Sequence, residues 1–298
     1  MPARNSASGF AAFAAFAAFA FLALCATGCV GGSEHVDPNA FSWSAPMAAP
    51  GELHLRNMNG RIDVKPATDG NVTVTAETRW HRGNPKKDVR FVAVPNGNDF
   101  TVCALWGKGT CTADNYNTSG NSVMRSLFSG GSGDATVNFT VYVPTGVKVD
   151  VFDLNGSVSV LATAPVKAKG INGNIKVGTS VGPVEATTIN GSVDARMTTL
   201  SGDGLVKVET MNGNASAYVP ATFDGSVHVT TTNGRTGSDF ALTVAGGSSR
   251  SNTLDGTVGA GTRRVEVKSV NGSAWLRKLN ADGTVSGVTP ATPAAAKP

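Results

Sequence analysis

Ile189-Asn190-Gly191-Ser192-Val193-Asp194-Ala195 is one copy of a unit that recurs along most of this 298-residue chain. The unit reads apolar-x-apolar-x-x-apolar-Asn-Gly-x-apolar-x-apolar, and we number its positions from the apolar residue before Asn-Gly, which is position zero. Short alternating runs around a turn dipeptide are typical of β-strands, so the repeat predicts an all-β fold. Position zero is occupied by Met58, Leu154, Ile171, Ile189, Met211, Thr232, Leu254 and Val270.

The Asn-Gly dipeptides mark the predicted corners of the repeat, because both residues tolerate the backbone conformations that tight turns require. Asp255-Gly256 replaces Asn-Gly after Leu254. The predicted structural corners are Asn59 and Gly60, Asn155 and Gly156, Asn172 and Gly173, Asn190 and Gly191, Asn212 and Gly213, Asn233 and Gly234, and Asn271 and Gly272.

Two arrangements compete, because Asn-Gly is also the strongest short signal for a β-hairpin. In a row of hairpins the residue before position zero would face the core, and that residue is polar or Gly in every copy. We therefore expect a corner in which position zero and the following Gly point inward. Stacked corners predict a β-solenoid with a ladder of Asn side chains, and the alternative is a β-sandwich or meander.

The start of the chain predicts export. Arg4 is the only charge before an apolar run from Phe10 to Leu24, which is shorter than the roughly 20 residues of a membrane-spanning helix. Ala26-Thr27-Gly28-Cys29 resembles the bacterial lipobox, although Ala26 stands where that motif usually has Leu. The resemblance implies a signal peptide over residues 1–28 and a lipidated Cys29 that holds the chain at a membrane. An ordinary cleaved signal and an uncleaved anchor are the alternatives.

Composition divides the rest of the chain. Residues 29–50 are rich in Gly, Ser, Pro and Ala and predict a flexible tether. A β-repeat domain is expected over 51–280, with an insertion at about 80–133, and a disordered tail over 281–298. Inside the insertion, the alternating runs on both sides of Pro95–Asp99 predict a β-hairpin with a five-residue loop.

Cys103 and Cys111 predict a disulfide. They are eight residues apart in a chain expected outside the cytoplasm, where disulfides persist. The pair matches neither the CxxC redox motif nor a zinc-binding pattern.

Catalytic, metal-binding and nucleic-acid-binding motifs are missing from the sequence. The net charge of +4 gives no reason to expect a nucleic-acid partner, and the four histidines lack metal-ligand spacing, so we expect neither a metal nor a cofactor. Gly178-Thr179-Ser180-Val181-Gly182 matches GxSxG, but no helical pattern follows it, as a hydrolase elbow requires. The acidic residues of the repeats form no obvious stacked cluster, which predicts a solvated face.

One basic, aromatic region is a candidate surface for a glycan or an anionic polymer. In the alternative interpretation, the tryptophans cap the core and the charges protect an edge strand from pairing. The candidate ligand residues are Trp80, Arg82, Lys86, Lys87 and Trp106.

The repeated Val-x-x-x-Asn-Gly-x-Val-x-Val units resemble the adhesin family of DUF4097 type over roughly residues 53–276, and Phe139–Val147 and Val102-Cys103-Ala104 are similar too. The resemblance implies a β-helical repeat domain without assigned catalytic residues. We therefore expect a non-catalytic, lipid-anchored cell-envelope protein of the outer membrane, which acts as an adhesin or as a binding or scaffold module. The alternatives are a carbohydrate-active enzyme on a β-helix and a structural protein that self-associates through open coil edges.

Overall fold

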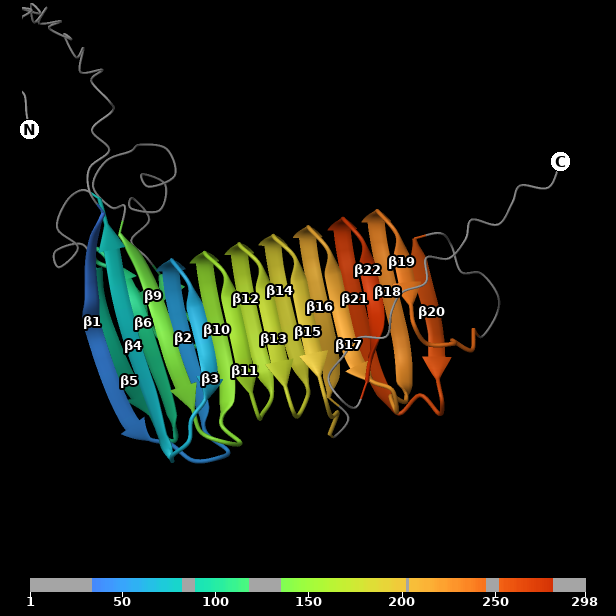
Figure 1. Cartoon of the computed structure of the whole chain (residues 1–298), viewed down its shortest axis with the longest axis horizontal. Coiled ribbons are helices and arrows are strands. Elements are labelled where there is room, and N and C mark those ends of the chain that lie inside the picture. The colour runs from blue at the N-terminus through green and yellow to red at the C-terminus, as the bar shows by residue number, and fades with distance from the viewer. Residues whose placement is uncertain (1–33, 82–88, 118–134, 202–203, 245–251, 281–298) are drawn as a thin grey trace, which may run out of the picture. The chain divides into compact units, whose positions relative to one another are not determined.

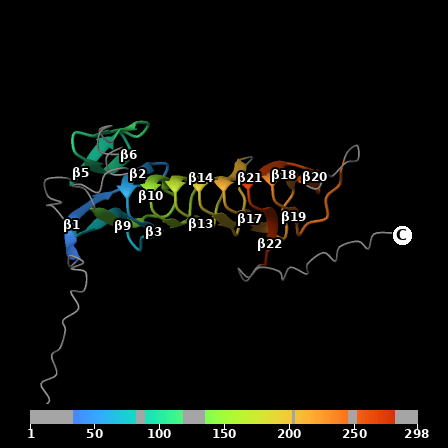
Figure 2. The same cartoon turned by 90° about the horizontal axis from the view of Figure 1, so that it is seen from above.

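Successive repeat strands alternate between two facing sheets of ten strands each (Figures 1 and 2). The computed structural model describes residues 34–81, 89–117, 135–201, 204–244 and 252–280, which form strands and no helix. The prediction of an all-β fold is therefore confirmed. No described helix is long and apolar enough to cross a membrane.

Each repeat unit with an Asn-Gly corner gives one strand to each sheet, and we call such a pair a rung. The unit around Leu254, which has Asp255-Gly256, does not form the expected corner but lies within one strand, β20 (Thr253–Val258). The first strand of a rung lies in the sheet that we call sheet B, and the second lies in sheet A. The rungs are β2 (Glu52–Asn59) with β3 (Ile62–Pro66), β10 (Lys148–Asn155) with β11 (Val158–Ala162), β12 (Val166–Asn172) with β13 (Ile175–Thr179), β14 (Val184–Asn190) with β15 (Val193–Met197), β16 (Leu205–Asn212) with β17 (Ala215–Pro220), β18 (Gly225–Asn233) with β19 (Thr236–Ser238), and β21 (Arg263–Asn271) with β22 (Ala274–Leu279).

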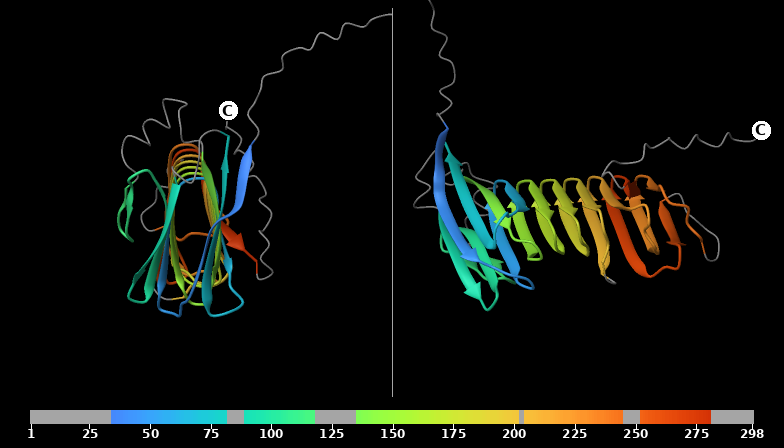
Figure 3. Two further views of the ribbon diagram at one scale, coloured as in Figure 1. Left: turned by 90° about the vertical axis from the view of Figure 1, so that its left-hand side faces the viewer. Right: turned by 60° about the horizontal axis from the view of Figure 1, so that its bottom comes forward.

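Neighbouring rungs pair in parallel and in register, so equivalent repeat positions lie side by side. Asn172, for example, is the partner of Asn155 on one side and of Asn190 on the other. The corners of successive rungs therefore overlap when the array is viewed along its length (Figure 3). This alternation between sheets is the feature on which the solenoid prediction depends, while two facing sheets also match the sandwich alternative.

The last rung in the chain is not the last rung in space. Rung β21–β22 lies between rungs β16–β17 and β18–β19 in both sheets. The antiparallel strand β20 (Thr253–Val258) pairs with the other edge of β18 and ends sheet B. The chain therefore runs past the vacant position, forms the outer rung and returns to fill the gap.

Strands from the N-terminal third extend the opposite end of both sheets. β1 (His35–Pro46), β4 (Asn71–Trp80) and β9 (Thr136–Val143) extend sheet A, while β5 (Val89–Asn96) and β6 (Asp99–Trp106) extend sheet B. β5 and β6 form the predicted hairpin with a tighter turn than expected, because Asn96 already pairs with Asp99. β7 (Thr110–Cys111) and β8 (Tyr116–Asn117) form a separate two-stranded sheet.

The tether prediction for residues 29–50 is wrong over His35–Pro46, which form β1 and pair with β4. Aromatic packing explains the difference. The Phe41 ring stacks on Phe91 at 5.0 Å between centroids, and Trp43 lies 4.9 Å from Phe100. These rings bind the strand to the hairpin of sheet B.

Glycine is required at the corners because neighbouring rungs make backbone contact there. Gly173 has a φ of 147°, and a Cβ atom built on it would lie 1.9 Å from the carbonyl oxygen of Gly156. The same Cβ on Gly191 would lie 2.2 Å from the oxygen of Gly173. Beside these contacts the side-chain amides form a ladder, in which Asn172 donates to Asn155 at 2.7 Å and Asn190 donates to Asn172 at 2.8 Å.

Position zero points outward and position −1 points inward, which is the opposite of our expectation. Thr188 and Thr210, at position −1, are 6% and 4% exposed, whereas Ile189 and Met211, at position zero, are 40% and 49% exposed. Side chains continue to alternate between inward and outward through position zero, and this alternation is interrupted only at the Asn-Gly corner. The central apolar residue therefore faces outward in these rungs, whereas Met58, at position zero of β2, is 4% exposed.

Inward-facing hydroxyl groups at position −1 have hydrogen-bond partners in the adjacent rung. Thr210 Oγ1 donates to the Gly191 carbonyl at 2.7 Å, and Ser269 Oγ donates to that of Gly213 at 2.8 Å. Thr188 and Thr231 make the equivalent bonds to Gly173 and Gly272. Each bond satisfies a buried donor and a corner carbonyl together, so a polar residue is stable in the core here.

Asp153 departs from this pattern, because it places a carboxyl group at position −1. Asp153 is fully buried, and neither carboxyl oxygen forms a hydrogen bond of ordinary geometry with the described residues. Burial raises the pKa of Asp153 to about 8, although the nearby backbone amides of Asn155 and Leu154 favour the charged form. The carboxyl group is therefore mainly protonated at neutral pH.

We expect Asp153→Thr to flatten the dependence of stability on pH. The folded-state pKa of about 8 exceeds the ordinary value of 3.8, so the native state binds the extra proton between these limits. The contribution of Asp153 is fully present below about pH 4 and is lost as the pH rises to about 8, by up to about 1.4 kcal/mol per pH unit. Thr also restores the hydroxyl found in other rungs.

Urea unfolding at about pH 5 and about pH 8 measures this dependence. Asp194→Thr, which changes an acid on the outer face of β15, is the matched control. An equal loss of stability with pH in the wild type and in Asp153→Thr would contradict the assignment.

Candidate functional site

The outer face of sheet B carries three rows of side chains that run across the strands. Positions −4, −2 and zero of each rung point to this face, because alternate residues of a strand share one side. In-register pairing then aligns each position over successive rungs. We call this surface the ladder face.

Position −4 forms a row in which basic side chains, two of them histidines, alternate with acidic ones. Only Asp255 comes from outside the parallel rungs, since it lies on the antiparallel strand β20. We call this the charge row. In spatial order it is His54, Asp150, Lys167, Glu185, Lys207, Glu266, His228 and Asp255.

The charge row was not predicted, although no two of its acids are adjacent. Asp150, Glu185 and Glu266 lie in line, each between basic neighbours. Opposite charges on adjacent strands stabilise pairing, and like charges there would oppose it. A hydrogen bond to Glu209, followed by the charges of Glu209, Glu185 and Glu266, raises the pKa of Lys207. Reading position −4 of every repeat would have found this row.

Position zero forms an apolar row along the corner edge of the same face. Ile189 and Met211 are 40% and 49% exposed, and Leu154, Ile171 and Val270 are half-buried. Single exposed apolar residues are normal, but a continuous row beside a charge row is a feature of interaction surfaces.

The segment that follows β6 and contains β7 and β8 covers the N-terminal end of the ladder face, and we call it the stapled loop because a disulfide joins it to β6. Cys103 on β6 is bonded to Cys111, as predicted. The Arg56 side chain, 6% exposed, donates to the Ala113 carbonyl in the loop and to the Asp150 carboxylate at 2.7 Å. Tyr116 packs edge-on against Phe152 with ring centroids 5.9 Å apart. The buried arginine therefore ties the loop to β2 and β10.

Two hollows open at this end of the ladder face, one beneath the loop and one next to it. The one beneath the loop has a volume of about 340 Å³ and is lined by Arg56, Ala113, Asp114, Asn115, Tyr116, Asp150, Phe152, Lys167 and Lys169. The other has a volume of about 410 Å³ and is lined by Glu52, Lys148, Val149, Pro165, Val166, Lys167, Pro183, Val184, Glu185, Leu205 and Lys207. They share Lys167, so they adjoin.

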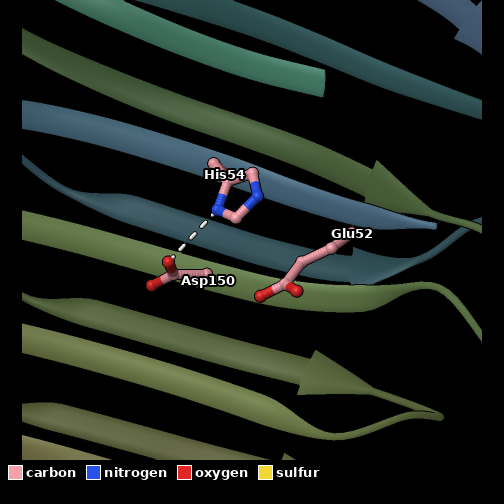
Figure 4. Close-up of side chains that lie close together, drawn as sticks. All are labelled: Glu52, His54 and Asp150. Atoms are coloured by element: carbon pink, nitrogen blue, oxygen red, sulfur yellow. Dashed lines mark hydrogen bonds and ion pairs between the residues drawn. The ribbon is translucent and has the colours of Figure 1, made fainter. Parts of the chain in front are cut away.

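Glu52, His54 and Asp150 form a cluster between the two hollows (Figure 4). One possible ligand atom from each residue lies within 4.8 Å of the others. His54 Nδ1 is 3.2 Å from Asp150 Oδ2. Burial acts to raise the pKa of Asp150, but hydrogen bonds from His54 and Arg56 and the Arg56 charge outweigh it and hold this pKa below its ordinary value. An imidazole and two carboxylates could hold a divalent cation.

Of the ligand surface expected from the basic, aromatic region, only Trp80 and Trp106 lie in the described part of the chain. Trp106 is 3% exposed at the end of β6 in sheet B, so its ring face is not available to a ligand. Trp80 ends β4 in sheet A and stacks on His35. Arg82, Lys86 and Lys87 lie outside the described residues, as do Cys29, the predicted signal peptide and the tail.

A glycosidase needs an accessible carboxylic acid with a raised pKa beside a second carboxylate. Among the described residues, the carboxyl group with a raised pKa is that of Asp153, which is buried inside the array. The GxSxG segment is the end of β13 and a turn into β14, without a helix. Neither feature supports catalysis.

Comparisons with known proteins give distant structural likenesses. No protein-family model matches the chain, and no curated protein matches it. A proposed cell adhesion protein from Clostridium sporogenes ATCC 15579 is similar with a TM-score of 0.45 and 11% identity, over 83% of this chain and 99% of that one. A proposed adhesin from Bacteroides fragilis NCTC 9343 has a TM-score of 0.31 and 10% identity, over 82% and 98%.

We expect Lys207→Glu to destabilise the fold more than Lys207→Gln does. The glutamate would lie in register between Glu185 and Glu266, whereas glutamine only removes the positive charge. Like charges on adjacent strands should lower the free energy of unfolding by about 0.2–1 kcal/mol beyond the glutamine variant. Denaturant unfolding of both variants at low and high salt measures the difference, which should shrink as salt screens it. Equal stability of the two variants at low salt would contradict the charge row.

Proposed function

We propose that this protein is a non-catalytic recognition module of the cell envelope that binds an extended glycan across the ladder face. The observation that carries the proposal is the parallel course of the charge row and the apolar row over successive rungs. Sugar units have apolar C–H faces and polar hydroxyl edges, so a chain of several units that lies across the face can contact the two rows, which are about 13 Å apart along the strands, through different units. Because each rung offers an equivalent set of positions, a polymer with repeating units fits better than a single small molecule.

The array is, in this proposal, a flattened β-solenoid at the outer membrane, anchored through lipid on Cys29. The alternation of strands between the sheets and the in-register corners support the solenoid. The signal-like N-terminus supports export, and the Cys103–Cys111 disulfide supports a compartment outside the cytoplasm. The resemblance of the repeats to the DUF4097-type adhesin family agrees with an adhesive role.

Self-association through sheet edges is the second candidate. Strands β1 and β19 are the edges of sheet A, and an edge strand offers unpaired backbone groups to another chain. β19 has only three residues, and β1 carries Pro38 and Pro46, which blunt these edges. These features disfavour growth through sheet A, which leaves β5 and β20, the edges of sheet B, as the strands through which chains could associate.

A glycan-binding screen tests the proposal with the full chain purified in detergent. The double variant Ile189→Thr/Met211→Thr removes the exposed apolar surface. Threonine is compatible with β-strands, so the fold should be kept. We expect the variant to bind its best glycan at least about tenfold more weakly, since burying such side chains contributes roughly 1.5 kcal/mol or more.

Leu161→Thr is the matched control, because Leu161 is 54% exposed but belongs to β11 in sheet A. Its affinity should equal that of the wild type. If the wild type binds no glycan or other envelope polymer, or if Leu161→Thr loses as much affinity as the double variant, the ladder face is not the binding surface.

A further inference from the structure

We propose that Glu52, His54 and Asp150 form a zinc-binding site at the N-terminal end of the ladder face. The inference does not depend on the proposed glycan function. Glu52 and His54 are two residues apart on β2 and therefore point to the same side of the strand. Asp150 lies on the adjacent strand β10, in register with His54. Two strands thus bring three ligand groups to one point (Figure 4).

The distance between the two best-defined ligand atoms fits a tetrahedral metal ion. His54 Nδ1 and Asp150 Oδ2 are 3.2 Å apart, which is long for a charge-assisted hydrogen bond. Two ligand atoms at about 2.0–2.1 Å from a tetrahedral zinc ion lie about 3.3 Å from each other. A zinc ion can therefore replace the shared proton with little movement of either strand.

The position of Glu52 completes the cluster. Lys148 is the in-register neighbour of Glu52, yet no ion pair joins the two side chains in the described part of the chain. The Glu52 carboxylate instead lies within 4.8 Å of the ligand atoms of His54 and Asp150 (Figure 4). Two carboxylates at this distance repel each other unless a cation or a proton lies between them.

Arg56 has the place of an outer-shell residue that orients a ligand. Its guanidinium group donates to Asp150 Oδ2 at 2.7 Å and to the Asp150 carbonyl at 2.8 Å. Hydrogen bonds of this kind fix metal-binding carboxylates in other sites.

Imidazole and carboxylate ligands together suit zinc better than calcium or magnesium, which prefer oxygen ligands alone. Three protein ligands leave a fourth position of the tetrahedron open. Glu52 and Asp150 each line one of the adjoining hollows, so this position is accessible from the ladder face. Both cysteines of the described part are in the disulfide and do not compete for the metal.

Zinc titration of the full chain, without an affinity tag, tests the site by calorimetry and chelator competition. We expect one zinc ion per chain, and at least about tenfold weaker binding in His54→Gln and in Glu52→Gln. These two variants avoid Asp150, whose removal would leave Arg56 buried without its carboxylate. Far-ultraviolet circular dichroism confirms that both variants keep the fold. Cobalt in place of zinc should give the strong visible absorption of a tetrahedral ion.

His228→Gln is the matched control, because His228 Nδ1 also contacts a carboxylate, that of Asp255, but belongs to no three-residue ligand cluster in the described part of the chain. Its zinc affinity should equal that of the wild type. Absence of zinc binding by the folded wild type would overturn the proposal. So would equal weakening in His228→Gln and His54→Gln, or a cobalt spectrum without tetrahedral bands.

Discussion

Backbone contact between glycines at successive corners is the constraint on which the whole array depends. A Cβ atom on Gly173 or Gly191 would lie about 2 Å from the carbonyl oxygen of the preceding corner. At such a distance neighbouring rungs cannot slip by a residue without a clash, so the corners fix the register of both sheets together. The Asn ladder and the buried hydroxyls of position −1 then add hydrogen bonds that form only in this register.

A fixed parallel register creates a problem that the charge row solves. If every repeat had the same charge at position −4, like charges would lie on adjacent strands throughout sheet B. The signs alternate instead, and they do so in spatial order. Lys207 and His228 occupy position −4 of rungs that are consecutive in the sequence. In space Glu266 lies between them, because rung β21–β22 is inserted there. Alternation of charge is therefore a sequence signal for the order of the rungs.

The sequence predicted the strands and corners because their signals are local, whereas long-range features remained hidden. Asn-Gly and the flanking valines mark each corner directly. The prediction that Ile189 points inward was wrong. It placed the break in the inward-outward alternation before position zero, whereas the break lies at Asn190-Gly191. β1 was missed because Pro and Ser obscure the alternation of Phe41 and Trp43. His54 and Asp150 are 96 residues apart, and only the register brings them together.

Departures from the repeat concentrate at rungs β2–β3 and β10–β11, beside the stapled loop and the two adjoining hollows. Position −1 holds Asn57 and Asp153 in place of a hydroxyl, and each leaves a buried oxygen without a hydrogen-bond partner among the described residues. Above them, Arg56 is buried beneath the stapled loop. Natural proteins break their own local rules mainly where function requires it. The regular rungs supply the repeating rows of the ladder face, and the irregular pair differs from them in its buried polar groups and in the loop that covers it.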